Sequence, residues 1–417
     1  MKVYISGISG TGMGPLALMA KAAGMKVCGS DLSKGAIYDE LIDAGIEVKI
    51  GEQDGEFLRW NLEDVDWFVY TSALPENHPE LKLAREVGLK CTKRDDFTAF
   101  LVDYLGLKMV AVAGTHGKTT TTSMIVWMCL KLGLPVSYIV GTTLGFAPSG
   151  AYHDGDEYFV YEADEYDRNF LKYKPWLSVI TTIDYDHPDI YPTREDYVAA
   201  FEQFMDQSEY VLDADDSKSG DYFMIAGKAR RQDARMAMGA VLVMYQDLME
   251  QGRVESPDFE KMTSVLEDFP GVGRRFEKLT DGIYTDYAHH PEEIRATIDV
   301  AQDECKMRNK KGVVVVYQPH QNTRQHEMRD GYKDAFSGVE KIYWLPTYLT
   351  RENPELEVLT SEELIAGLKN SDAAKVAELN DELFAEIIKW RNAGYLVLLM
   401  TAGPADGWLR EKLSQES

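Results

Sequence analysis

An apolar run leads directly into the sequence Gly-Thr-His-Gly-Lys-Thr-Thr-Thr at 114–121, which opens a helix-like stretch over 118–132. A strand that turns through glycines into a helix gathers backbone N–H groups and the positive end of the helix at one point, where phosphate oxygens bind. Lys118 is placed to reach the terminal phosphates of a nucleotide, and the Thr119 hydroxyl to hold Mg²⁺. The usual spacing puts a glycine at position 112, where this chain has valine, so the loop is a contracted variant. The segment predicts a protein that uses a nucleoside triphosphate.

The charge balance of the chain limits the kinds of partner that it can bind. The 417 residues include 44 basic and 69 acidic side chains, which gives a formal net charge of −25. A surface of this sign repels nucleic acid and anionic membranes, so we expect neither as a partner. An anionic ligand then needs a local positive pocket such as the one around Lys118. The length is typical of two to four domains.

Cysteine usage and hydropathy favour a cytoplasmic protein. The four cysteines are scattered without a Cys-x-x-Cys pair, which fits a reducing compartment and predicts neither a zinc site nor a disulfide framework. The N-terminus enters a strand and a glycine turn at once, without the pattern of a signal peptide. The longest apolar stretch, 124–140, is broken by Lys131, Gly133 and Pro135 and is too interrupted to span a bilayer. The sequence is compatible with a monomer or a homodimer.

The first block, residues 1–107, begins like a doubly wound α/β domain. Its first strand runs into Gly-Ile-Ser-Gly-Thr-Gly-Met-Gly at 7–14, and its second strand, 26–29, leads to Ser30 and Asp31. Such folds place a diphosphate over the glycine turn and a carboxylate near a ribose. NAD is the default ligand of this pattern, but the separate triphosphate loop argues against a dehydrogenase. Another apolar strand, 67–70, ends at Thr-Ser-Ala, where a ligand-facing loop belongs.

The middle block, residues 108–270, places carboxylates after two further strands. One strand leads into Glu-Ala-Asp-Glu-Tyr-Asp at 162–167, and the next, 177–183, leads into Asp-Tyr-Asp-His at 184–187. Mg²⁺ prefers oxygen ligands and bridges substrate phosphates, so we expect Glu162 and His187 to hold it. The competing interpretation of His187 is a turn residue bonded to a neighbouring carboxylate. The competing interpretation of Asp164, Glu165 and Asp167 is a solvated acidic loop.

The third block, residues 271–417, repeats the alternation of strands and helices. A strand at 282–285 leads into Asp-Tyr-Ala-His-His-Pro at 286–291, and an apolar strand at 313–316 leads into Tyr-Gln-Pro-His. Thr-Ser-Glu-Glu at 360–363 forms a capping box for a later helix, and a last strand follows at 395–400. The pattern predicts a second doubly wound sheet.

In this order the motifs resemble those of the Mur ligases, the ATP-dependent amide-forming enzymes of peptidoglycan precursor synthesis. The resemblance covers nearly the whole chain. Its motifs are 7–13, Gly-Ser-Asp at 29–31, Thr-Ser-Ala at 71–73, 114–121, Glu-Ala-Asp-Glu at 162–165, Asp-His at 186–187, Gly-Val-Gly-Arg-Arg-Phe at 271–276, 286–291 and Gln-Pro-His at 318–320. The histidine in the phosphate loop and the 286–291 segment are similar to the branch that joins L-alanine to UDP-N-acetylmuramate.

The resemblance implies an α/β protein of three domains that serves cell-wall synthesis, and with it cell shape and division. Residues 1–107 would form an N-terminal Rossmann-like domain for the UDP-sugar. Residues 108–270 would form a central P-loop ATPase-like parallel sheet for ATP and Mg²⁺. Residues 271–417 would form a C-terminal Rossmann-like domain for the amino acid, closing about a hinge near Gly271 and Gly273.

The resemblance also assigns roles to particular side chains. The expected UDP-sugar site is Ser9, Gly10, Thr11, Gly12, Met13, Asp31, Ser72 and Ala73. The expected ATP site is Gly114, Thr115, His116, Gly117, Lys118, Thr119, Thr120 and Arg275. The expected metal ligands are Thr119, Glu162 and His187. The expected catalytic residues are Lys118, Glu162, His187 and Arg275, and the amino-acid site is Asp286, His289, His320 and Arg324.

Two departures from the family pattern leave alternatives open. The alanine-adding branch usually continues after His320 with arginine, but here Gln321 follows, and glutamine lacks the guanidinium charge. The acceptor is therefore either L-alanine or the murein tripeptide that a recycling ligase adds to UDP-N-acetylmuramate. No lysine lies in 197–207, so the carbamylated lysine of other Mur branches is absent.

The second departure lies between His187 and Gly271, where this chain is shorter than the family pattern. Residues 227–234 stand in place of a Gly-x-His-Asn-x-x-Asn pattern near adenine, and Arg230 and Asp233 would read the base differently. A non-catalytic regulator that binds the UDP-sugar is the alternative. Retention of Lys118 and Glu162 argues against it, because a binding module has no need of them.

Overall fold

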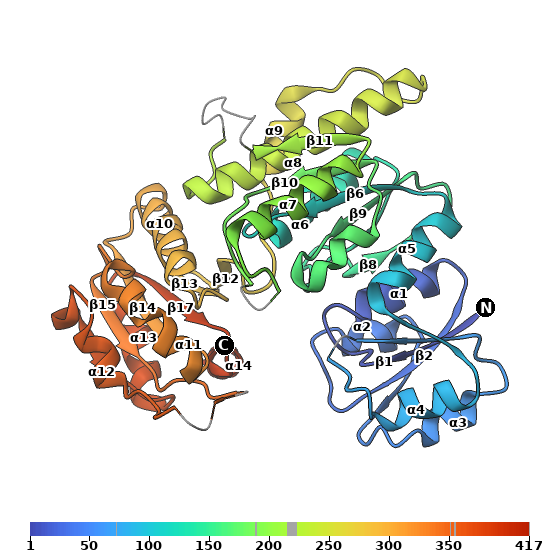
Figure 1. Cartoon of the computed structure of the whole chain (residues 1–417). Coiled ribbons are helices and arrows are strands. Elements are labelled where there is room, and N and C mark those ends of the chain that lie inside the picture. Colours follow the sequence, from blue (N-terminus) through green and yellow to red (C-terminus); the bar gives the residue numbers. More distant parts are fainter. Residues whose placement is uncertain (72, 188–189, 215–222, 351, 354–355, 417) are drawn as a thin grey trace. The chain divides into compact units, whose positions relative to one another are not determined.

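The computed structural model describes residues 1–71, 73–187, 190–214, 223–350, 352–353 and 356–416. They divide into two compact units. The first unit comprises Met1–Phe223 with Gln232–Pro270, and the second comprises Met224–Arg231 with Gly271–Ser417. Each unit is an α/β structure, and Figure 1 shows their three sheets with the helices that cover them. The predicted fold class is confirmed, while the exact domain boundaries remain a prediction.

The first sheet has five parallel strands in the order β3-β2-β1-β4-β5. Its strands are β1 (Lys2–Ser6), β2 (Lys26–Asp31), β3 (Glu47–Ile50), β4 (Trp67–Tyr70) and β5 (Lys90–Lys93). Its helices are α1 (Gly14–Ala22), α2 (Tyr38–Asp43), α3 (Glu56–Asn61), α4 (Pro79–Glu86) and α5 (Arg94–Leu105). The order reverses between β1 and β4, so the turns after these two strands flank the crevice where doubly wound sheets bind ligands.

The second sheet has the order β11-β10-β6-β9-β7-β8, and only its edge strand β8 runs antiparallel. Its strands are β6 (Lys108–Ala113), β7 (Val136–Ile139), β8 (Gly150–Ala151), β9 (Tyr158–Glu162), β10 (Leu177–Ile180) and β11 (Tyr210–Asp213). The helical elements are α6 (Lys118–Leu132), η1 (Tyr166–Lys172), α7 (Arg194–Asp206), α8 (Lys228–Glu250) and α9 (Phe259–Glu267). Because β6 lies between β10 and β9, the loops after these three strands meet at one edge of the sheet.

The third sheet, in the second unit, has the order β12-β13-β17-β14-β15-β16, with β12 antiparallel. Its strands are β12 (Glu277–Thr280), β13 (Ile283–Asp286), β14 (Val313–Gln318), β15 (Lys341–Trp344), β16 (Ala374–Val376) and β17 (Leu396–Thr401). The helical elements are α10 (Pro291–Met307), α11 (Asn322–Met328), η3 (Arg329–Asp334), α12 (Ser361–Ala366), η4 (Ser371–Ala373), α13 (Asp381–Asn392) and α14 (Ala405–Glu416). The predicted capping box is present: Thr360 accepts from the Glu363 amide, and the Glu363 carboxylate accepts from the Thr360 amide.

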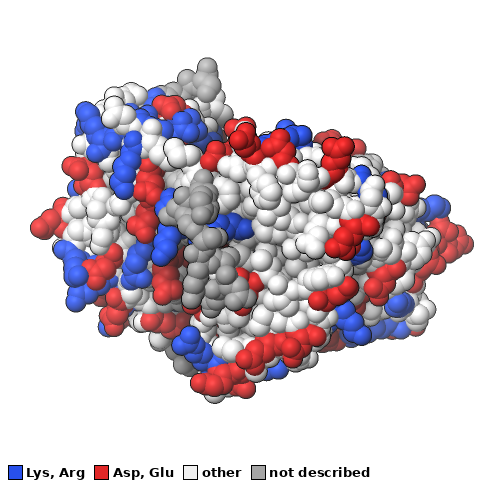
Figure 2. Space-filling view, turned by 90° about the horizontal axis from the view of Figure 1, so that it is seen from above, with Lys and Arg blue, Asp and Glu red and all other residues white. Residues whose placement is uncertain are grey.

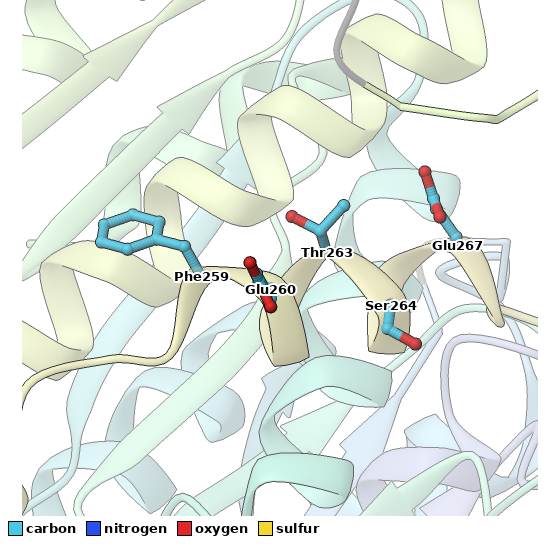
Figure 3. Close-up of a pocket in the computed structure, with 5 residues that line it drawn as sticks. All are labelled: Phe259, Glu260, Thr263, Ser264 and Glu267. Atoms are coloured by element: carbon cyan, nitrogen blue, oxygen red, sulfur yellow. The ribbon is translucent and has the colours of Figure 1, made fainter.

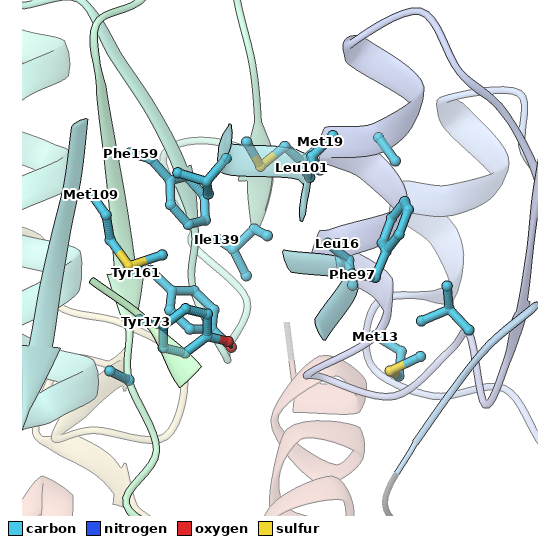
Figure 4. Close-up of a cluster of buried hydrophobic side chains, with 14 of the residues drawn as sticks. Met13, Leu16, Met19, Phe97, Leu101, Met109, Ile139, Phe159, Tyr161 and Tyr173 are labelled. Atoms are coloured by element: carbon cyan, nitrogen blue, oxygen red, sulfur yellow. The ribbon is translucent and has the colours of Figure 1, made fainter. Parts of the chain in front are cut away.

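One apolar core joins the first two sheets. Met13, Leu16 and Met19 from the first glycine turn and α1 belong to the same buried cluster as Met109 and Tyr161 of the second sheet (Figure 4). Burying such side chains contributes about 1.5–3 kcal/mol each. The glycine turn of the first sheet and the phosphate loop of the second are therefore parts of one packed unit.

No helix in the described ranges is both long enough and apolar enough to cross a bilayer. Over the face in Figure 2, basic side chains lie interspersed with acidic ones instead of gathering in one basic surface.

Candidate functional site

The predicted phosphate loop forms the turn between β6 and α6, and the helix spans the residues that the sequence indicates, Lys118–Leu132. Gly114 has φ 138° and Gly117 has φ 81°, which are left-handed conformations that favour glycine. A Cβ atom on Gly114 would lie 2.2 Å from the Thr181 hydroxyl oxygen, so only glycine fits there. The turn 114–117 and the first residues of α6 thus lie together, which is the arrangement expected of an ATP site.

The segment that follows β10, the strand next to β6, and helix α7 hold this loop in place. The Thr115 amide donates to the carbonyl oxygen of Thr182 over 2.9 Å, and the His116 amide donates to the Thr182 hydroxyl over 3.0 Å. The Thr115 hydroxyl also lies 2.8 Å from the hydroxyl of Tyr197. The loop is thus fixed before any ligand arrives, which lowers the cost of ordering it on binding.

Lys118 is paired with Glu165. Its ammonium nitrogen lies 2.9 and 3.1 Å from the two carboxylate oxygens of Glu165, and it also donates to the carbonyl oxygen of Gly114. The side chain of Glu165 is 2% exposed. The interpretation of Glu165 as part of a solvated acidic loop is therefore wrong, because the strand order brings it under the phosphate loop.

Thr119 and Glu162 meet at the site expected for a metal. The Thr119 hydroxyl lies 2.9 and 3.0 Å from the carboxylate oxygens of Glu162. Among the described residues, no group of three His, Cys, Asp or Glu side chains could hold a metal ion by itself. Mg²⁺ usually takes one or two protein oxygens and completes its shell with water and substrate phosphates. The hydroxyl and carboxylate therefore fit Mg²⁺ bound together with a nucleotide.

His187 lies on the other side of Glu165. Its Nε2 atom is 3.5 Å from Glu165 and 3.7 Å from Asp186, and its φ is 57°. The hydrogen bond to Glu165 raises the pKa of His187 against the effect of burial. Burial raises the pKa of Glu165, but the hydrogen bond from His187 and the charge of Lys118 outweigh it, so the net pKa is lowered. His187 thus contacts the Lys118–Glu165 pair, and its role as a metal ligand stays a prediction.

A pocket of about 240 Å³ joins the two loops of the first unit. Thr11 and Gly12 from the first glycine turn line it together with Lys118 and Glu162. The remaining lining residues are Arg94, Ile139, Gly141, Tyr161 and Asp164. Arg94 belongs to none of the motifs that the sequence displays. Its position, directly after β5 at the carboxyl end of a parallel strand, was the available signal.

Thr11 and Gly12 bring the glycine turn of the first sheet to this pocket. Ser9 and Met13 are buried, whereas Gly10 and Thr11 are exposed. Asp31 accepts a hydrogen bond from the Ser9 amide over 2.9 Å, so it braces the turn. The side chains of Ser9 and Met13 belong to the interior, so only their backbone atoms remain expected contacts of the UDP-sugar.

The other residues expected at the UDP-sugar lie beyond β4. Ala73 is exposed, and its amide donates to the Thr71 hydroxyl over 3.3 Å. Ser72 lies outside the described residues.

Asp286, at the end of β13, is buried and uses both carboxylate oxygens within its own unit. One oxygen accepts from the Phe276 amide over 2.7 Å, and the other from the Ala288 amide over 2.7 Å and the Thr297 hydroxyl over 3.3 Å. Burial raises its pKa, and the charge of Arg275 opposes the rise. Asp286 therefore orders the surrounding loops, and its place in the amino-acid site stays a prediction.

His289 and His320 do come together in the second unit. Their rings meet edge to face at 5.5 Å between centroids, and His320 stacks on Tyr348 at 5.8 Å. Burial lowers the pKa of His289, Glu293 opposes the shift, and the charge of Arg324 adds to it. Both rings lie just beyond the carboxyl ends of β13 and β14, and their role in binding the amino acid stays a prediction.

The two arginines expected at this end of the unit are also placed. The guanidinium carbon of Arg275 lies 5.5 Å from the Tyr287 ring centroid. Arg324 lies on the short helix α11, which follows Gln321 at φ 61°.

The segment in place of the family's adenine pattern is divided between the two units. Arg230 lies 6.0 Å from the Phe276 ring in the second unit. In the first unit, a Cβ atom on Gly117 would lie 2.3 Å from a carboxylate oxygen of Asp233, and the Thr121 hydroxyl lies 3.3 Å from that oxygen. Asp233 is thus beside the phosphate loop, and Arg230 belongs to a different unit.

A second hollow, on α9, is not a comparable site. Figure 3 shows its lining residues on one helix: Phe259, Glu260, Thr263, Ser264 and Glu267. It has two acidic side chains and no basic one, and its only large apolar side chain is Phe259. It therefore lacks the charge that a phosphate-bearing ligand needs.

Three family models match successive parts of the chain. The Mur ligase family, catalytic domain, matches residues 2–104; the Mur ligase middle domain matches 112–232; and the Mur ligase, glutamate ligase domain, matches 274–403. Together they cover most of the 417 residues.

Curated relatives align over nearly the full length. The UDP-N-acetylmuramate–L-alanine ligase of Kineococcus radiotolerans is 32% identical, over 96% of this chain and 93% of its own. The enzyme of the same name from Lactobacillus acidophilus is 30% identical, over 96% of each chain.

Solved structures share the fold. The UDP-N-acetylmuramate–alanine ligase of Thermotoga maritima matches with a TM-score of 0.77 at 23% identity, over 100% of this chain and 99% of its own. A murein peptide ligase of Psychrobacter arcticus matches with a TM-score of 0.61, also at 23% identity, over 99% and 98%.

Proposed function

This chain belongs to the Mur ligase family, and from that premise we propose that it is an ATP-dependent ligase that joins L-alanine to UDP-N-acetylmuramate in peptidoglycan precursor synthesis. The observation that carries the proposal is the shared pocket of the first unit. There, Thr11 and Gly12 of the glycine turn face Lys118 and Glu162 of the nucleotide site. A ligase needs this arrangement because the acid and the triphosphate must react with each other.

The reaction would take two steps. A carboxylate oxygen of the sugar-linked acid attacks the γ-phosphorus of ATP, the new P–O bond forms, the bond to the β-phosphate oxygen breaks, and ADP leaves. The amine nitrogen of alanine then attacks the acyl carbon, a C–N bond forms, the C–O bond to phosphate breaks, and the nitrogen loses a proton. Activation is required because a free carboxylate is a poor electrophile.

The residues of the phosphate loop would position the nucleotide. The backbone N–H groups of 114–120 and the ammonium group of Lys118 would bind the phosphates. Thr119 and Glu162 would hold Mg²⁺, with His187 as the third ligand that we propose. Bound Mg²⁺ would supply charge that offsets the negative charge of the transferring phosphoryl group.

We assign the remaining substrates to the rest of the chain. The backbone of Gly10 to Gly12 would bind the diphosphate of the sugar nucleotide, and His289, His320 and Arg324 would bind the amino acid. Arg275 would contribute a phosphate contact from the second unit. We place the reaction in the cytoplasm, where ATP is supplied.

A phosphate-release assay tests this function. The full-length protein, ATP and Mg²⁺ are incubated with UDP-N-acetylmuramate and, in parallel, alanine, glycine, serine or no amine. We expect phosphate release that requires the acid and is fastest with L-alanine. Binding of the sugar nucleotide without phosphate release for any amine would contradict the proposal and favour a regulator.

A murein tripeptide is the second candidate acceptor. The observation in its favour is Gln321, which stands where the alanine-adding branch usually has arginine and adopts φ 61°. The loss of a guanidinium weakens recognition of a single amino-acid carboxylate. Adding the tripeptide to the same assay separates the two candidate acceptors. Phosphate release with the tripeptide but not with alanine would identify the tripeptide as the acceptor.

A further inference from the structure

Arg94 is the first residue of α5, at the carboxyl edge of the first sheet. It lines the shared pocket, where the other basic lining residue is Lys118. A Cβ atom on Gly12 would lie 2.7 Å from its Nη1 atom, so the guanidinium rests against the backbone of the glycine turn. Arg94 therefore stands between the turn expected to bind the sugar diphosphate and the loop expected to bind ATP.

A buried carboxylate fixes the orientation of this guanidinium. Asp95 is 1% exposed, and its Oδ1 atom accepts from Nε and Nη2 of Arg94 over 3.1 and 3.0 Å. The hydroxyls of Tyr161 and Tyr173 donate to the same oxygen over 3.2 and 2.9 Å. Burial raises the pKa of both tyrosines, so they stay protonated and keep donating. Nε–H and one N–H of Nη2 thus donate to Asp95, and the Nη1 group remains for a ligand.

The two cations of the pocket differ in what they already bind. Lys118 is neutralised by Glu165 and donates to carbonyl groups of its own loop. Within the described part of the chain, the structure gives Nη1 of Arg94 no hydrogen-bond acceptor, although Glu162 and Asp164 line the same pocket. An anion entering between those carboxylates needs a positive group, and a guanidinium matches a carboxylate in geometry.

We propose that Arg94 is a catalytic residue that binds the carboxylate of the acid substrate and holds it for attack on the γ-phosphorus. The proposal rests on the ligase function above. Two anions must approach to bonding distance in that step, so a fixed cation beside them lowers their repulsion. Arg94 serves the acid and not the nucleotide, because it extends from the first sheet and adjoins Gly12, whereas the phosphate loop has its own donors.

Two sugar nucleotides that differ in one carboxylate test the assignment. Binding of UDP-N-acetylmuramate and of UDP-N-acetylglucosamine, which lacks the lactyl carboxylate, is measured by calorimetry on the full-length wild type and on Arg94→Ala. We expect the wild type to prefer the acid by about tenfold or more, and Arg94→Ala to lose most of this preference. In turnover, we expect the KM for UDP-N-acetylmuramate to rise while the KM for ATP stays unchanged.

A matched control removes the neighbouring charge. Lys93 precedes Arg94 and pairs with Asp167 over 3.3 Å, and it is not among the lining residues of the pocket. Lys93→Ala should keep the preference for the acid. Should Arg94→Ala fail to fold, the double variant Arg94→Met/Asp95→Asn removes the cation together with its buried partner, and its preference for the acid is measured in the same way.

The outcomes separate this inference from the function it rests on. A variant at Arg94 that keeps the full preference for the acid, or that changes only the KM for ATP, overturns the assignment and leaves the ligase intact. A wild type that binds neither sugar nucleotide and releases no phosphate overturns the ligase function and this inference together.

Discussion

The ammonium group of Lys118 lies 2.9 Å from a carboxylate oxygen of Glu165, which is almost fully buried. The two residues are 47 positions apart and meet because β6 and β9 are neighbours in the sheet. The pair fixes the lysine at the phosphate loop before a nucleotide binds. It also links the loop to His187, which contacts the same carboxylate.

Lys118→Ala should lower kcat/KM for ligation by about 10²–10³-fold, because a preorganised charge at the transferring phosphate is lost. Lys131→Ala, on the exposed side of the same helix, should stay near the wild-type rate. Removal of Lys118 leaves Glu165 buried and unpaired, so folding is checked with Lys118→Ala/Glu165→Gln. Near-normal ligation by Lys118→Ala would refute its assigned role.

Glu162→Gln should raise the Mg²⁺ concentration needed for half-maximal activity, because an amide oxygen is a weaker ligand for a hard cation than a carboxylate. Chelation of Mg²⁺ should abolish phosphate release by the wild type. The measurement is a Mg²⁺ titration of the phosphate-release rate at fixed ATP. An unchanged titration curve would show that Glu162 does not hold the metal.

Glu80→Ala should destabilise the first unit more than Glu80→Gln. The buried carboxylate of Glu80 accepts from the hydroxyls of Tyr4, Ser6 and Ser30 over 2.6–2.8 Å. Each buried donor left without an acceptor costs about 1–3 kcal/mol. Urea unfolding measures the difference, and Glu76→Ala, which breaks an exposed pair, should leave the midpoint close to wild type. Equal effects of the two Glu80 variants would contradict the proposed hydrogen bonding.

His289 should titrate below the usual histidine pKa of about 6.5, because burial and the charges of Arg324 and Arg275 disfavour the imidazolium, while Glu293 opposes them. Below that pH the unfolded chain takes up a proton that the folded chain does not. The stability of the second unit should therefore fall as the pH drops through 6.5 and be unaffected by His289 above it. An NMR titration assigned with His289→Asn measures the pKa, and a value above 6.5 would contradict this.

Local sequence signals determined much of the fold. The glycines and lysine at 114–118 predicted where α6 begins, and the four residues at 360–363 predicted a capping box that the structure contains. The apolar strand 67–70 was also predicted with its observed bounds. These features depend on neighbours within one turn or strand, so the sequence contains nearly all the information that fixes them.

Only the tertiary structure decided which side chains meet. Glu165 became the partner of Lys118 because of the strand order, and the carboxylate of Asp286 accepts from the amides of Phe276 and Ala288. Arg94 reached Gly12 because a helix that starts after β5 shares a crevice with the turn after β1. Spacing along the chain does not contain these distances, because they depend on how the sheet orders its strands and on which polar groups the packing buries.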